Sequence, residues 1–246
     1  PAGPDGTSKP YNEKQDPTGQ NEFPGFAPHA ICELHARLTS HFKTYRMLQK
    51  LNDPGRAPQL EMTKANIMST MGILAHYTGD VAQPLHTTKH HHGWIGPNPN
   101  NYTTDGKIHA YIDGTVIFQH GLNYNTLKPT QTYTISIDKA DPASMWQAVI
   151  AYTKRSHEKV EETYKLFKDK AFEREEGKRF IVERLNDAGA MLGAIYASAW
   201  NASVPTQQDL DDLVRYDGFR PDQVPQQDRE PAEKPAEKPS DKPATP

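Results

Sequence analysis

Histidine and aspartate residues gather in one short stretch of this 246-residue chain. The segment AHYTGDVAQPLHTTKHHHGW, residues 75–94, holds five histidines and one aspartate on the two sides of a proline. Imidazole nitrogens and carboxylate oxygens are ligands that zinc takes in proteins. The composition of this segment therefore indicates a candidate metal site.

Two histidine–aspartate pairs have the same spacing. His76 and Asp80 are four residues apart, and so are His109 and Asp113. On an α-helix these positions lie one turn apart on the same face. His86 follows just beyond QPL, where a bend at the proline can return the chain toward the end of the preceding helix. One such pair alone is usually a solvated surface pair, so the prediction of a metal site depends on both pairs and His86 occurring together.

The apolar periodicity of the chain is helical and predicts an all-α fold. We expect a single domain over residues 29–217, with about five to seven helices around a metal cluster. The predicted helices are 29–51, 61–80, about 106–120, 141–172 and 178–203. Asp141 and Pro142 are the expected cap and first residue of the fourth helix. The only strand-like alternation is at 132–137.

The two ends of the chain lack this periodicity. We expect an irregular arm over residues 1–28 and a disordered, proline-rich tail over residues 218–246, where proline and alternating charges repeat. The chain has no run of eighteen apolar residues, so no transmembrane segment is predicted. The net charge of -3 gives no argument for a strongly basic nucleic-acid surface. We expect a monomer.

The motif HYTGDVAQPLH, followed by HAYID, resembles the superfamily of zinc-dependent phospholipases C and fungal single-strand-specific nucleases, which includes bacterial members. The shared pattern is H-x3-D-x5-H ending in QPLH, then H-x3-D/E; here His109 follows His86 by 23 residues. The firm match covers residues 75–114. The resemblance implies an all-α fold that binds up to three zinc ions, and a secreted, periplasmic or cell-surface location.

The resemblance also implies a role for each ligand. His76 is similar to a ligand of one ion of a close pair, and Asp80 to the catalytic carboxylate that bridges this pair. His86, His109 and Asp113 are similar to the protein ligands of the remaining ion. The implied reaction is hydrolysis of a phosphodiester by a metal-bound hydroxide. The substrate stays open between phospholipid headgroup esters and single-stranded nucleic acid.

The chain also departs from the family pattern. The family uses an N-terminal tryptophan and further early ligands, whereas this chain begins at Pro1 and its first tryptophan is Trp94. We interpret this as a missing N-terminal part, which would leave the paired-ion site incomplete. His90, Trp94 and Tyr102 are candidate substrate contacts, although HHHGWIGPNPNN differs from the glycine-rich stretch of the nucleases. The alternatives are a non-catalytic metal-binding helical module and a helical interaction domain with chance histidines.

Overall fold

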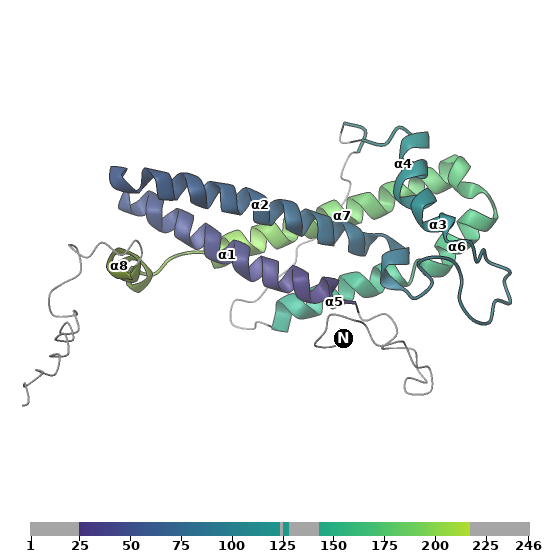
Figure 1. Ribbon diagram of the computed structural model, residues 1–246, viewed down its shortest axis with the longest axis horizontal. Coiled ribbons are helices and arrows are strands. Elements are labelled where there is room, and N and C mark those ends of the chain that lie inside the picture. The colour runs from purple at the N-terminus through teal and green to yellow at the C-terminus, as the bar shows by residue number, and fades with distance from the viewer. Residues whose placement is uncertain (1–24, 124, 128–142, 217–246) are drawn as a thin grey trace, which may run out of the picture. The chain divides into compact units, whose positions relative to one another are not determined.

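The computed structural model describes residues 25–123, 125–127 and 143–216, and the statements below concern these residues (Figure 1). Within them the regular secondary structure is helical, and no strand occurs. The all-α prediction is therefore confirmed. The strand-like segment 132–137, the predicted cap at Asp141 and Pro142, residues 1–24 of the arm and the tail 218–246 lie outside the described residues.

The first two long helices lie side by side (Figure 1). Helix α1 spans Ala27–Leu51 and α2 spans Ala57–Ala82, with the short 3-10 helix η2, Pro54–Arg56, between them. Asn52 caps the C-terminus of α1: its backbone is left-handed with a φ of 48°, and its N–H donates to the carbonyl of Leu48. Helix α1 begins two residues before the predicted start, because Pro28 is tolerated in the first turn of a helix.

Two further long helices complete the larger core. Helix α5 spans Ala143–His157 and α7 spans Glu175–Ala202. Fully buried side chains from all four long helices pack together, among them Ile31, Leu38, Leu74, Val149, Tyr152 and Ile195. Burial of each large apolar side chain contributes about 1.5–3 kcal/mol. A buried hydrogen bond also joins two of these helices, since the Tyr152 hydroxyl of α5 donates to the backbone carbonyl of Thr78 on α2 at 2.7 Å.

The predicted continuous helix over 141–172 is wrong. Helix α5 ends at His157, and α6 spans only Val160–Lys168 before the 3-10 helix η5, Ala171–Glu173. The break separates two apolar faces that pack in different cores. Tyr152 of α5 belongs to the larger core, whereas Tyr164 of α6 is buried in a second one. The high charge of the segment concealed this change of partner.

The second core is built from short elements. They are η3 (Pro84–Thr87), α3 (Lys107–Ala110), the π-helix η4 (Tyr111–Thr115) and α4 (Val116–Gln119), with α6 and the start of α7. Together, α3, η4 and α4 cover most of the helix predicted at 106–120, although the π-turn in its middle was not predicted. Gly177 is required here, because a Cβ at this position would lie 2.3 Å from the Cα of Phe172.

A separate compact unit begins at Pro205 and contains helix α8, Gln207–Tyr216. The sequence interpretation did not predict this helix. Thr206 and Asp209 form a reciprocal cap at its start, in which each side chain accepts a hydrogen bond from the other residue's backbone N–H. No helix in the described ranges is long and apolar enough to cross a membrane.

Candidate metal centre

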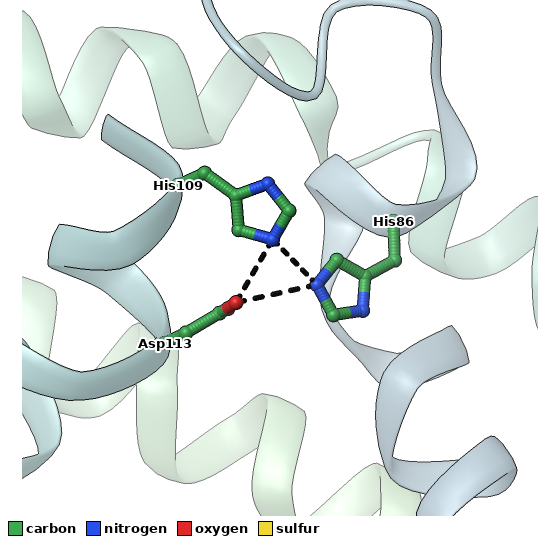
Figure 2. Close-up of side chains that lie close together, drawn as sticks. All are labelled: His86, His109 and Asp113. Atoms are coloured by element: carbon green, nitrogen blue, oxygen red, sulfur yellow. Dashed lines mark hydrogen bonds and ion pairs between the residues drawn. The ribbon is translucent and has the colours of Figure 1, made fainter. Parts of the chain in front are cut away.

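Three side chains from separate parts of the second core converge on one point (Figure 2). His86 comes from η3, His109 from α3 and Asp113 from the π-turn. The Nε2 atoms of the two histidines are 2.8 Å apart. The Asp113 Oδ2 atom lies 2.9 Å from Nε2 of His109 and 3.4 Å from Nε2 of His86. These are the three residues that the resemblance assigned to one ion.

The dimensions of this triangle suit a small divalent ion. Given edges of 2.8, 2.9 and 3.4 Å, the circle through the three ligand atoms has a radius of roughly 1.8 Å. A zinc–ligand distance of about 2.0–2.1 Å exceeds this radius, so the three atoms could hold one ion together. The two-nitrogen, one-oxygen ligand set is one that zinc accepts, and it leaves a fourth position for water or substrate.

The charges of His86 and Asp113 stabilise each other. The hydrogen bond with Asp113 raises the pKa of His86 above its ordinary value, against the opposing effect of burial. For Asp113, burial raises the pKa of the carboxyl, but the hydrogen bonds from His86 and Gln83 outweigh burial and hold the pKa below its usual range. The carboxylate form that binds metals is therefore favoured at neutral pH.

Gln83 fixes the geometry of the triad from the end of α2. Its Oε1 atom accepts a hydrogen bond from the N–H of Leu85 at 2.6 Å, which starts the 3-10 turn that carries His86. Its Nε2 atom donates to Oδ1 of Asp113 at 2.9 Å. One side chain thus links two segments that supply ligands. The sequence interpretation missed Gln83, although its place before Pro84 is typical of a residue that caps a turn.

The π-turn shapes the helix that carries the other two ligands. Helix α3 supplies His109, and the i→i+5 turn that follows supplies Asp113. Isolated π-turns of this kind occur frequently at functional sites. The spacing of four residues predicted that the two side chains share a face, and their 2.9 Å separation agrees with it.

The His76–Asp80 pair lies on the last turns of α2. Nε2 of His76 is 3.3 Å from Oδ2 of Asp80, and Oδ1 of Asp80 is 3.7 Å from Nδ1 of His86. The His76 side chain is 69% exposed, against 19% for that of His109. Asp80 therefore lies between the triad and an exposed imidazole.

The predicted substrate contacts at the rim pack against each other. The His90 and Trp94 rings are stacked with centroids 4.1 Å apart, and Trp94 also contacts Tyr102 at 4.9 Å. The buried ring of Tyr164 meets both Trp94 and Tyr102. One face of the Trp94 indole is thus covered by His90. The ring contacts among these three residues hold the loop after η3 together. His90 and Trp94 also line a pocket.

A pocket opens beside the triad. Its wall includes Asp80, His86 and His109, together with charged or ionisable groups from the loop and from the junction of α5 and α6: Lys89, His90, His91, His157, Glu158 and Glu161. His157 was not predicted. Its Nδ1 atom is 2.9 Å from the carbonyl of Thr87, which ties the end of α5 to the turn that carries His86.

The chain matches no protein-family model, no curated protein and no solved structure at significant similarity.

Proposed function

We propose that this protein is a zinc-dependent hydrolase of phosphodiester bonds. The observation that carries the proposal is the convergence of His86, His109 and Asp113, whose ligand atoms lie 2.8–3.4 Å from one another. The adjoining pocket gives a substrate access to two of these residues. Catalytic zinc sites in other proteins likewise have three protein ligands and one open position.

Bound zinc would supply Lewis acidity, which activates a water molecule and stabilises negative charge on the phosphoryl oxygens. The chain's own groups would then divide the remaining tasks. His86, His109 and Asp113 would hold one ion, while Asp80 would place negative charge where further cations bind. Lys89 has no ion-pair partner among the described residues and lies on the pocket wall, where its ammonium group can attract an anionic substrate.

A second candidate is a metal-binding module without catalytic activity. The exposure of His76 favours it, because among the described residues this imidazole has only one carboxylate partner, Asp80. Two groups make a weak site for additional ions. In this candidate the triad binds a single ion, and the ion holds η3 against α3 and the π-turn instead of activating water.

Metal stoichiometry and hydrolysis, measured together, test the proposal. Zinc would be counted by plasma mass spectrometry in the wild type, Asp80→Ala and His109→Ala. The same samples would be assayed with single-stranded DNA and with phosphatidylcholine vesicles. The proposal predicts two or more ions, fewer after Asp80→Ala, and hydrolysis of one substrate that both substitutions abolish.

The other outcomes separate the alternatives. One ion that is retained in Asp80→Ala but lost in His109→Ala, with neither substrate cleaved, would identify the non-catalytic module. No bound zinc in the wild type would exclude both proposals. The substrate that is cleaved decides between a phospholipase-like and a nuclease-like enzyme.

A further inference from the structure

Among the residues that the structure describes, the second ring nitrogen of His109 has no hydrogen-bond partner. Its Nε2 atom faces His86 and Asp113, and Figure 2 shows the other ring nitrogen, Nδ1, on the side away from the triad. This Nδ1 atom is buried and has no partner among the described residues. When Nε2 of a neutral histidine binds a metal ion, the proton is on Nδ1, and it is normally donated to a carboxylate, a carbonyl or water.

His92 lies beside this ring. The centroids of the His92 and His109 rings are 4.9 Å apart, with 44° between their planes. The backbone carbonyl and the Cβ of His92 lie 3.5 Å from the position that a Cβ on Gly106 would take, just before helix α3. The loop thus places the His92 backbone next to the start of the segment that carries His109. The position of the His92 imidazole then depends only on the side-chain torsions of His92.

The loop that carries His92 is constrained on both sides. Gly93 has a φ of 99°, and a Cβ there would meet the carbonyl oxygen of Thr104 at 2.4 Å. The next N–H, that of Trp94, donates to the carbonyl of Thr103 at 2.8 Å. On the other side of His92, the Tyr164 hydroxyl donates to the carbonyl of His90. These contacts place the His92 backbone without using its imidazole.

We propose that His92 is a positioning residue, which accepts the Nδ1–H hydrogen bond of His109 when Nε2 of His109 binds the metal ion. This inference rests on the metal centre of the proposed function. Rotation of the His92 ring about its broad χ2 torsion brings a ring nitrogen toward Nδ1, since the centroid separation of 4.9 Å allows contact between the ring edges. The hydrogen bond fixes the tautomer and the orientation of His109 and raises its basicity as a ligand.

His91 is the obvious rival and fits less well. Its ring centroid is 6.2 Å from that of His109, and the two planes are 85° apart. It also lines the pocket, whereas His92 does not. His91 is therefore the matched control, because it is the same residue type and the neighbouring position in the same loop.

The test is a zinc titration of the full chain against a competing chelator. His92→Ala should weaken zinc binding about 10–100-fold, the usual cost of losing such a partner. His92→Phe keeps a ring without an acceptor and should lose as much. His92→Asn, whose amide oxygen accepts a hydrogen bond, should stay within about threefold of the wild type. Thermal unfolding of the zinc-free proteins shows whether each variant is folded.

Each result decides one claim. If His92→Ala and His92→Phe bind zinc as tightly as the wild type, or if His91→Ala loses as much as His92→Ala, the role of His92 is refuted. His109→Ala tests the metal centre separately. If zinc affinity survives that substitution, the metal site of the proposed function fails; if it is lost while His92→Ala is unaffected, only the inference about His92 fails.

Discussion

The two histidine–aspartate pairs have the same spacing but different surroundings. His109 and Asp113 meet a third group, since Nε2 of His86 lies 2.8 Å from the imidazole and 3.4 Å from the carboxylate. The His76 imidazole contacts one carboxylate and is 69% exposed. The first pair spans helix α3 and the π-turn that follows it, whereas the second lies at the end of the regular helix α2.

The difference shows what local spacing can supply. A separation of four residues on a helix brings two side chains together, as it does in both pairs. A third ligand has to come from elsewhere in the chain, and here it is delivered by the turn after α2 and held by Gln83.

The largest expected effect is loss of the ion from the triad. His86→Ala should weaken binding of the first zinc ion by more than about 100-fold, because a direct ligand contributes more than the 10–100-fold of an outer partner. His76→Ala should leave that first ion unchanged. Competition with a fluorescent zinc chelator measures both affinities. Equal losses in the two variants would mean that the pairs act as one site.

A smaller loss is expected for Gln83→Ala. This change removes the hydrogen bond to Asp113 and the one that starts η3, so zinc affinity should fall about tenfold. Gln208→Ala on α8 is the matched control, because within the described part of the chain its amide donates a hydrogen bond to Asp212 in the next turn and to no other side chain. An unchanged affinity in Gln83→Ala would show that the triad is positioned without this side chain.

The charge of Asp113 should be visible in the titration of His86. In the zinc-free protein, the pKa of His86 should lie above 6.5, because the hydrogen bond to Asp113 favours the imidazolium. Protons should therefore begin to compete with zinc above pH 6.5, and zinc affinity should decrease as the pH falls. In Asp113→Asn the pKa of His86 should move down, as measured by NMR. A wild-type value at or below 6.5 would contradict the proposed pairing.

The smallest effect on zinc binding is expected from a change in the core behind the exposed His76–Asp80 pair. Tyr152 donates to the carbonyl of Thr78, which lies between His76 and Asp80 on α2. Tyr152→Phe should lower the free energy of unfolding by about 1 kcal/mol. For a domain of this size, the melting temperature falls by about 2–4 °C. The affinity of the triad should stay constant. Weaker zinc binding with unchanged stability would show instead that Tyr152 supports the metal site and not the fold.

The sequence predicted the helices whose partners do not change along their length. The stripe of α1, with Ile31, Leu34 and Leu38, meets the same core from end to end, so periodicity was sufficient. It failed between α5 and α6, because the break depends on two different cores that accept the two halves. No local pattern carries that information.

The candidate site divides in the same way. Residue types and spacing selected His76, Asp80, His86, His109 and Asp113 as candidate ligands. The family resemblance grouped His86, His109 and Asp113, and the structure brings these three together. The π-turn, the contact of Gln83 with Asp113 and the proximity of His92 to His109 join residues that are distant in sequence or depend on backbone detail. Trp94 and Tyr102 were predicted to contact substrate from their type alone, whereas their packing against Tyr164 becomes visible only in the folded chain.

The 2.8 Å approach of the two Nε2 atoms has a calorimetric consequence. Two imidazole nitrogens at this distance share one proton, since two lone pairs or two N–H groups facing each other repel. Zinc can bind both nitrogens only after this proton moves, either to Nδ1 of the same ring when both rings are neutral, or to solvent when one ring is an imidazolium. Because the pKa of His86 is raised, uptake of the first ion should release more protons as the pH falls. The measured heat of binding would then change with the ionisation enthalpy of the buffer, and the slope would report the number of protons expelled.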